Sequence, residues 1–274
     1  MKDSVKYSAV MRSAGGRMED SHPRRFMARS RRYIFFDLGE TLIELQGLVV
    51  SLTEVLRGRV PDLRREAKDL AREWAIRAAS RLPKAQGPDF DTEHHIGSVV
   101  LQELLKADGV SVRLKDAVGM IENTMELSVD RVRLYPDVDT EWLDRVRGLT
   151  AGMGVVTDGD AQFVPRVLDR LGIRRFFDNV TTSEDARAYK PDSLIYYVAL
   201  EAMGADASMS LFVSDSALDL QGAAALGMGT VQIVRQFLPH EPAVPAGCVR
   251  LGTLRELDKV VSGYPGATLS DRRP

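Results

Sequence analysis

The sequence predicts an α/β protein with a parallel sheet and one all-helical insert, and three observations lead to that prediction. Short runs of aromatic and β-branched residues alternate with helical patterns along most of the chain. Notable polar residues follow the ends of several of these runs. Residues 50–131 interrupt the alternation with helical periodicity alone. Strands that alternate with helices form parallel sheets covered by helices on both faces, because the crossovers are right-handed.

The composition is that of a globular protein in a reducing compartment. A chain of 274 residues with 44% hydrophobic and 28% charged residues can form a main domain and a smaller one. Its one cysteine, Cys248, can form no internal disulfide, and no Cys/His spacing suits zinc, so we expect a cytoplasmic protein. The apolar runs fall short of the roughly 20 residues that span a bilayer, and the N-terminus lacks a secretory core. No membrane partner and no export are therefore expected.

The N-terminal segment is strongly basic. Residues 1–32 carry nine Lys or Arg and three Asp or Glu, whereas the whole chain has a formal net charge of −2. Such an arm can bind nucleic acid, but this one has neither interleaved aromatic residues nor a periodic apolar face. We expect residues 1–31 to be a disordered extension with no nucleic-acid partner. Residues 1–26 should be dispensable, and a true start at Met27 is an open alternative.

The first predicted strand begins at Tyr33 and ends at Asp37, where Gly39 marks a turn. Further β-rich runs cover residues 151–156, 179–182, 211–213 and 230–234.

Helical spacing of apolar residues predicts core helices at 139–147, 161–171 and 191–203. Gly148, Gly172 and Gly204 stand where C-terminal caps belong, and Pro191 stands in a favoured first-turn position. Three more amphipathic helices fall within the insert, which leaves the sheet after the first strand and returns near Tyr135. We expect it to form a lid over the carboxyl edge of the sheet. The predicted domains are a core of residues 32–49 and 132–262, a helical cap of 50–131, and a C-terminal tail of 263–274.

Polar residues gather where parallel sheets bind ligands, beyond the carboxyl ends of the strands. Asp37 ends the first predicted strand, Thr157 follows the second and Asp215 the fourth, and Lys190 comes shortly after the third. In this order they resemble the four signature motifs of the haloacid dehalogenase-like superfamily of hydrolases. The motifs are Asp37-Leu-Gly-Glu-Thr-Leu42, Thr157-Asp-Gly159, Lys190-Pro-Asp192 and Ser214-Asp-Ser-Ala-Leu-Asp219, the last followed by Gly222-Ala223. The resemblance covers about residues 32–260 and implies a Rossmann-like core with a helical cap.

The resemblance also implies roles for these residues. The Asp37 carboxylate would attack phosphorus and hold the phosphoryl group covalently, which splits one hard hydrolysis into two easier steps. Mg²⁺ would be held by Asp37, Asp215 and the main-chain carbonyl of Gly39, since it prefers oxygen ligands and keeps several waters. The Thr157 hydroxyl and the following amide N–H, that of Asp158, would bind the phosphoryl oxygens, and Lys190 would supply a fixed positive charge.

Asp219 lies one helical turn beyond Asp215 and has two open interpretations. It would hold a metal-bound water or orient Lys190, or it is an ordinary acid of a helix N-terminus, favoured by the dipole.

The departure from the family's pattern is Gly39. Most phosphatases of the family have a second aspartate here, which protonates the leaving group and later activates water. Either a good leaving group needs no such acid, or Glu40 or an acid of the lid replaces it. His94 and His95 of the lid are more typical of a helix surface than of catalysis.

These observations predict a Mg²⁺-dependent phosphomonoester hydrolase that acts on a small phosphorylated metabolite. One alternative is a 2-haloacid dehalogenase, which uses the same aspartate without metal; Asp215 and Gly39 both argue against it, because dehalogenases have an uncharged residue and a tyrosine there. The other is a catalytically weak member that binds a phosphorylated metabolite or a protein partner, for which Gly39 is the support.

Overall fold

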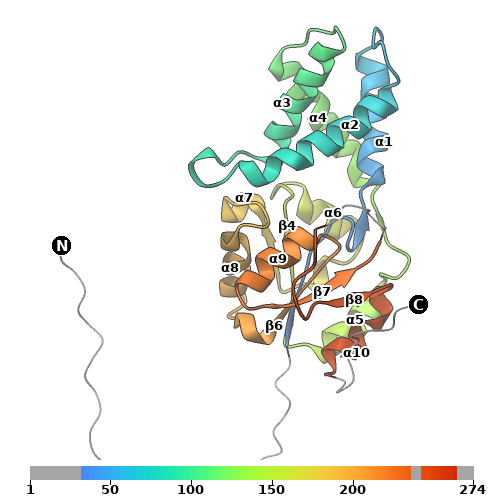
Figure 1. The fold of residues 1–274 in the computed structure, drawn as a ribbon. Coiled ribbons are helices and arrows are strands. Elements are labelled where there is room, and N and C mark those ends of the chain that lie inside the picture. The colour runs from blue at the N-terminus through green and yellow to red at the C-terminus, as the bar shows by residue number, and fades with distance from the viewer. Residues whose placement is uncertain (1–31, 236–241, 264–274) are drawn as a thin grey trace, which may run out of the picture. The chain divides into compact units, whose positions relative to one another are not determined.

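The centre of the molecule is a six-stranded sheet in which every pair of neighbours is parallel. The computed structural model describes residues 32–235 and 242–263. The strands lie in the order β5 (Asn179–Thr182), β4 (Gly152–Thr157), β1 (Tyr33–Phe36), β6 (Ser210–Ser214), β7 (Gly229–Ile233) and β8 (Val249–Leu251). All carboxyl ends therefore meet at one edge (Figure 1). This confirms the predicted α/β class with a parallel sheet.

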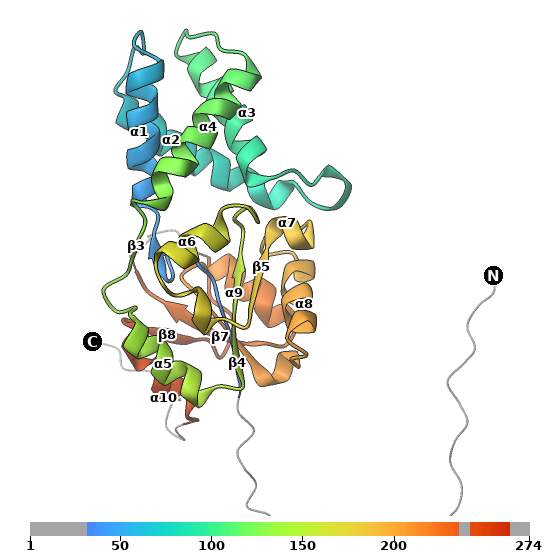
Figure 2. The same ribbon diagram turned by 180° about the vertical axis from the view of Figure 1, so that it is seen from behind.

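Helices cover both faces of the sheet, as the alternation of side chains on a strand requires. Ile34 and Phe36 of β1 enter one apolar cluster and Phe35 enters another. The first cluster includes α5 (Thr140–Leu149), α6 (Val164–Arg170) and α10 (Leu257–Val261). The second includes α7 (Ser183–Ala186), α8 (Ser193–Ala202) and α9 (Ala217–Ala225). Figures 1 and 2 show these two layers from opposite sides.

Four helices follow the first strand in the sequence, before the chain returns to the sheet, and they lie beyond the carboxyl edge of the sheet (Figure 1). We call residues 46–129 the helical segment. It comprises α1 (Gln46–Arg59), α2 (Ala67–Arg81), α3 (Glu93–Ala107) and α4 (Leu114–Val129). An antiparallel pair, β2 (Ile43–Glu44) and β3 (Arg133–Leu134), joins its two ends to the core. Apolar residues at helical spacing, such as Leu70, Trp74 and Ala78 of α2, bury the inner faces of these helices.

The structure differs from the sequence prediction at several helix starts; α6, for example, begins at Val164 rather than at residue 161. Helix α1 was not predicted, and the expected boundary between residues 49 and 50 falls inside it, because Gly47 and several β-branched residues weaken the local helical signal. Helix α8 begins at Ser193 rather than at Pro191, because the Asp192 side chain accepts the backbone N–H of Leu194 and caps the helix there.

The sequence also predicts glycine caps at helix ends and an extension at each end of the chain. Gly172 and Gly204 have φ of +71° and +58°, as expected just past a helix. The predicted cap at Gly148 is wrong, because α5 continues through Gly148 to Leu149. The predicted N-terminal extension, residues 1–31, and residues 264–274 of the predicted tail lie outside the described residues.

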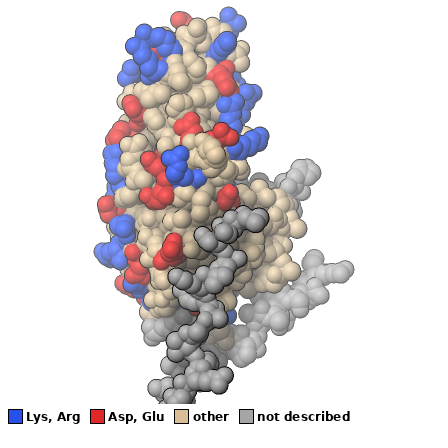
Figure 3. Space-filling model, turned by 90° about the vertical axis from the view of Figure 1, so that its left-hand side faces the viewer, with Lys and Arg blue, Asp and Glu red and all other residues tan. Residues whose placement is uncertain are grey.

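Charged side chains of both signs are interspersed on the face shown in Figure 3, and the described residues there show no continuous basic band. Among the helices of residues 32–235 and 242–263, none combines the length and apolar character needed to cross a membrane.

Candidate active site

The residues singled out in the sequence meet at the carboxyl edge of the sheet. Asp37 follows β1, Thr157 ends β4 and Asp215 follows β6. Because β1 pairs with both β4 and β6, these residues occupy neighbouring strand ends. Lys190 reaches them from the loop between α7 and α8. All four line one cavity of about 430 Å³, which side chains of the helical segment close on the opposite side.

Asp37 is buried, with 5% of its surface exposed, and both carboxylate oxygens have partners. The Lys190 ammonium pairs with Oδ1, and the Thr41 hydroxyl donates to Oδ2 at 2.9 Å. The Asp37 backbone N–H donates to the carbonyl of Val213 at 2.9 Å, which continues the ladder between β1 and β6. Burial raises the pKa of Asp37, while the Lys190 ammonium opposes the shift.

Thr41 joins two carboxylates and was not singled out in the sequence. Its Oγ1 lies 2.9 Å from Asp37 Oδ2 and 3.3 Å from Asp215 Oδ1, and it accepts the Asp215 backbone N–H at 3.0 Å. The signal that could have found it is local, since a hydroxyl four residues beyond Asp37 can reach back across a tight turn.

The carboxylates of Asp37 and Asp215 therefore lie on either side of one hydroxyl group. Burial, and next the negative charge of Asp37, raise the pKa of Asp215 to about 7. The described residues contain no group of three or more His, Cys, Asp or Glu side chains that could hold a metal ion. Two carboxylates are nevertheless compatible with Mg²⁺, which takes few protein oxygens and keeps several waters.

Lys190 is 4% exposed and lies among acids. Its ammonium contacts Asp37 and lies 2.8 Å from Oδ2 of Asp219. Burial disfavours this cation, but the charges of Asp219, Asp37 and Asp158 outweigh burial and raise the pKa of Lys190. Asp219 also lies in the first turn of α9, so both of the properties weighed for it, contact with Lys190 and an N-terminal helix position, are present together.

Asp158 has a side-chain contact that the motif did not indicate. Its Oδ1 accepts the backbone N–H of Lys190 at 2.9 Å, so the carboxylate orients the loop that carries the lysine. Burial raises its pKa to about 7, against the opposing charge of Lys190. The neighbouring Thr157 is buried, and its Oγ1 lies 3.5 Å from the backbone nitrogen of Gly159.

Gly39 and Glu40 form the turn after Asp37, and Glu40 is committed to holding it. Glu40 Oε1 accepts the backbone N–H of Leu45 at 2.9 Å, and Oε2 accepts the hydroxyl of Tyr135. Glu40 has φ of +53°, so the left-handed conformation of the turn falls on residue 40 rather than on Gly39.

Glu93, the first residue of α3, lines the same cavity and was not singled out in the sequence. Its backbone N–H donates to Asp160 Oδ1 at 2.9 Å. Burial, and then the charges of Asp160 and Asp158, raise the pKa of Glu93 to about 8. No local pattern could have indicated this position, because an acid at a helix N-terminus is common. Of the two histidines that follow, His95 is exposed, while the His94 backbone N–H donates to Asp160.

Together the fold and the site define an α/β protein with an acidic centre at the carboxyl edge of its sheet. The chain belongs to the haloacid dehalogenase-like hydrolase family, whose model matches residues 32–227. This match confirms the resemblance.

Curated relatives carry two kinds of activity, dehalogenase and phosphatase. The chain is 30% identical over 128 residues to "(S)-2-haloacid dehalogenase 4A" of Burkholderia cepacia, a match that covers 47% of this chain and 54% of the relative. It is 27% identical over 214 residues to a phosphoglycolate phosphatase of Pseudomonas fluorescens, covering 76% of this chain and 71% of the relative. The matches thus span only about half, or less, of the first dehalogenase relatives, down to 38% for that of Pseudomonas sp. strain YL.

Solved structures agree on the fold. An L-2-haloacid dehalogenase from Xanthobacter autotrophicus superposes with a TM-score of 0.69 at 16% identity, over 85% of this chain and 99% of that one. A HAD-hydrolase from Bacillus subtilis bound to magnesium superposes with a TM-score of 0.68 at 18% identity, with the same two coverages of 85% and 99%.

Proposed function

We propose that this hydrolase is a Mg²⁺-dependent phosphomonoester hydrolase that acts on a small phosphorylated metabolite through an aspartyl phosphate on Asp37. The observation that carries the proposal is the pairing of Asp37 and Asp215 around the hydroxyl of Thr41. A second carboxylate next to Asp37 repels an anionic substrate. The pair of carboxylates favours substrate binding only when a cation lies between them and the substrate.

The charge of the whole cavity supports the same conclusion. Lys190 is the one basic side chain among the described residues that line it, against seven acidic ones. These are Asp37, Glu40, Glu93, Asp158, Asp160, Asp215 and Asp219. Even with Glu93 protonated at neutral pH, the remaining acids outnumber Lys190, so a bound cation would favour binding of an anionic ester here. Asp37, Asp215 and the Gly39 carbonyl would hold Mg²⁺, which when bound stabilises negative charge on the transferring phosphoryl group.

The remaining side chains then have consistent tasks. The buried Asp37 carboxylate attacks phosphorus, and Lys190, held in place by Asp219, stabilises the charge of the phosphoryl oxygens. The Thr157 hydroxyl and the Asp158 amide N–H bind the same oxygens, while the Asp158 carboxylate orients Lys190.

A dehalogenase with this site would work less well. A 2-haloacid is itself an anion, and displacement of halide without metal leaves Asp215 as an uncompensated charge beside Asp37. The relatives carry both dehalogenase and phosphatase names, and the acids of this site favour the phosphatase activity. One cysteine in the sequence also suits an enzyme of the reducing cytoplasm.

The test is an assay of the purified chain with 4-nitrophenyl phosphate, a panel of phosphorylated metabolites and 2-chloropropionate, each with Mg²⁺ and with a chelator. We expect phosphate release that depends on Mg²⁺ and no halide release. Halide release that is unaffected by the chelator would establish a dehalogenase instead. Binding of phosphorylated metabolites with neither reaction would establish a catalytically inactive binding protein.

A further inference from the structure

We propose that Glu93 of the helical segment is the general acid and base of the hydrolysis and takes the place of the side chain that Gly39 lacks. The inference rests on the proposed phosphatase function and adds a catalytic residue to it. Four observations carry it: the position of Glu93, the direction in which the leaving group departs, the commitments of the other acids, and the protonation of Glu93.

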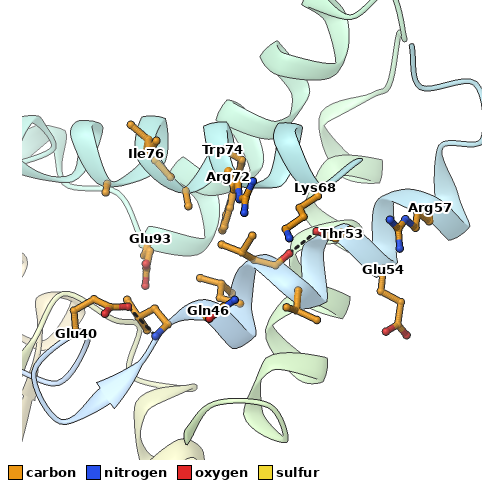
Figure 4. Close-up of a pocket in the computed structure, with 17 residues that line it drawn as sticks. Glu40, Gln46, Thr53, Glu54, Arg57, Lys68, Arg72, Trp74, Ile76 and Glu93 are labelled. Carbon is orange, nitrogen blue, oxygen red and sulfur yellow. Dashed lines mark hydrogen bonds between the residues drawn. The ribbon is translucent and has the colours of Figure 1, made fainter. Parts of the chain in front are cut away.

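Glu93 faces the residues that would hold the phosphoryl group. It lines the cavity together with Asp37, Lys190 and Thr157. The point at which a side chain on Gly159 would begin lies 3.9 Å from Glu93 Oε2 and also 3.9 Å from Thr157 Oγ1, so the two oxygens border the same small space. Figure 4 shows the Glu93 carboxyl directed from the helices toward the turn that holds Glu40.

The leaving group departs toward the helical segment. Attacking and leaving oxygens lie roughly in line in phosphoryl transfer. Asp37 attacks from the sheet side of the cavity, and the opposite side is closed by residues of the helical segment such as Ala79, Leu82 and Met125. The departing oxygen therefore faces the part of the wall from which Glu93 projects.

A groove beside α1 and α2 leaves room for the rest of the substrate. It shares with the cavity the lining residues Leu45, Leu48 and Ala79, as well as Glu40 and Glu93 (Figure 4). Glu93 thus lies where the cavity and the groove meet.

The other acids near the helical segment, Glu40 and Asp160, have both carboxylate oxygens engaged in hydrogen bonds that hold the fold. Both oxygens of Glu40 accept hydrogen bonds, from Leu45 and Tyr135. Both oxygens of Asp160 accept backbone N–H groups of α3, those of Glu93 and His94.

The acids on the sheet side are committed as well. Asp158 and Asp219 both bind Lys190, and Asp37 and Asp215 share Thr41. Within the described residues, no hydrogen bond or ion pair engages the Glu93 carboxyl. It is the acid of the cavity that is free to exchange a proton with a substrate.

Glu93 also carries the proton that a general acid must give. Its environment raises its pKa to about 8, so it is largely protonated at neutral pH. The titratable groups that face it are Asp158 and Asp160 after β4, Tyr189 before Lys190, and Glu40 across the cavity. The acids among them disfavour a further negative charge on Glu93.

The proposed reaction has two steps, phosphoryl transfer to Asp37 and hydrolysis of the aspartyl phosphate. The Asp37 carboxylate forms a bond to phosphorus, the bond from phosphorus to the ester oxygen breaks, and Glu93 gives its proton to that departing oxygen. The Glu93 carboxylate then removes a proton from water, the water oxygen bonds to phosphorus, and the bond from phosphorus to Asp37 breaks. Inorganic phosphate leaves, and both carboxyl groups return to their starting states.

The experiment compares Glu93→Gln with the parent on 4-nitrophenyl, phenyl and ethyl phosphate at saturating Mg²⁺, in single-turnover and steady-state assays. In single turnovers, transfer from ethyl phosphate should fall about 10²- to 10⁴-fold, and transfer from 4-nitrophenyl phosphate much less, because its leaving group needs little protonation. In steady state, 4-nitrophenyl phosphate should give a burst of one equivalent of product followed by slow turnover, since water attack lacks its base. The decline of kcat/KM near pH 8 in the parent should disappear.

The matched control is Glu122→Gln, which changes an exposed carboxylate of α4 and should behave as the parent in every assay. Glu93→Asp keeps the carboxyl group and should retain the pH profile, and it serves if Glu93→Gln does not fold. An equal fall in rate for all three esters, with no burst and with the parent's pH profile, would overturn the role of Glu93. It would leave the proposed phosphatase function intact. A parent that releases no phosphate from any ester would overturn the proposed function.

Discussion

The Asp160 carboxylate accepts the backbone N–H of Glu93 at 2.9 Å, so the loop after β4 in the core holds the first residue of α3 in the helical segment. The second oxygen of Asp160 accepts the N–H of His94, also at 2.9 Å. One buried carboxylate therefore satisfies two of the free N–H groups of the helix and keeps Glu93 at the wall of the cavity.

Replacing this carboxylate in Asp160→Asn should act on both the helix and Glu93. The amide turns an N–H group toward one of the α3 donors, which we expect to cost about 1 kcal/mol of unfolding free energy. It also removes a negative charge that raises the pKa of Glu93, so the alkaline decline of kcat/KM should move to lower pH. Urea unfolding and pH–rate profiles measure the two effects. A decline at the parent's pH would show that Asp160 does not influence the catalytic acid.

The raised pKa of Glu93 makes a prediction about stability. Between its ordinary value of 4.5 and about 8, folded Glu93 keeps a proton that the unfolded chain has lost. The unfolding free energy contributed by this residue therefore falls as pH rises through that interval. Glu93→Gln should lose less stability than the parent and than Glu122→Gln between about pH 5 and about pH 9, measured by Tm. Parallel curves for all three proteins would mean that Glu93 titrates normally.

Asp37→Asn should abolish turnover and leave the fold intact. The amide is a poor nucleophile, whereas Lys190 keeps its contact with Asp219 at 2.8 Å and is not left unpaired. Phosphate release from 4-nitrophenyl phosphate and far-UV circular dichroism check the two statements. Mg²⁺-dependent activity above about one part in 10³ of the parent's would contradict the nucleophilic role.

Asp215→Ala should chiefly weaken Mg²⁺ binding. Thr41 retains its hydrogen bond to Asp37, so the turn after β1 should persist while the metal loses one of its few protein oxygens. We expect the Mg²⁺ midpoint of activity to rise roughly 10- to 100-fold or more. Exposed Asp144→Ala on α5 is the control. An unchanged midpoint would remove Asp215 from the metal site.

Gly39→Asp should change the parent little, because Glu93 already protonates the leaving group, and should partly restore Glu93→Gln, most of all on alkyl phosphates. A Cβ at residue 39 would lie 2.8 Å from Cδ1 of Leu45, the tip of a side chain that is 37% exposed and can rotate. The comparison is a leaving-group series on the single and double variants, with Mg²⁺ affinity measured alongside. No recovery in the double variant, with unchanged metal binding, would mean that protonation of the leaving group does not limit Glu93→Gln.

Most of the core could be predicted because its signals are local. The runs at 33–37, 151–156 and 179–182 each match a strand to within a residue or so. Aromatic and β-branched residues favour strands, so a short run of them is a local signal. Helix α1 was not recognised because its apolar face is interrupted by Gly47 and by β-branched residues, and packing against α2 and α4 compensates for that weak propensity. The short pair β2 and β3 depends on contact between residues about 90 positions apart, which no local pattern contains.

By itself the sequence determined the class of fold and the strand ends at which Asp37, Thr157 and Asp215 lie, because a residue that follows a parallel strand has one edge of the sheet available to it. Only the tertiary structure decided what surrounds them. Thr41 bridges two acids because β1 and β6 pair in register, and Glu40 lines the cavity without a free oxygen because Leu45 and Tyr135 donate to both of its oxygens. Glu93 enters the cavity because α3 is held to the core by Asp160. Burial among other acids, which changes its pKa, is a property of residues far apart in the chain, so no periodicity or motif could have shown it.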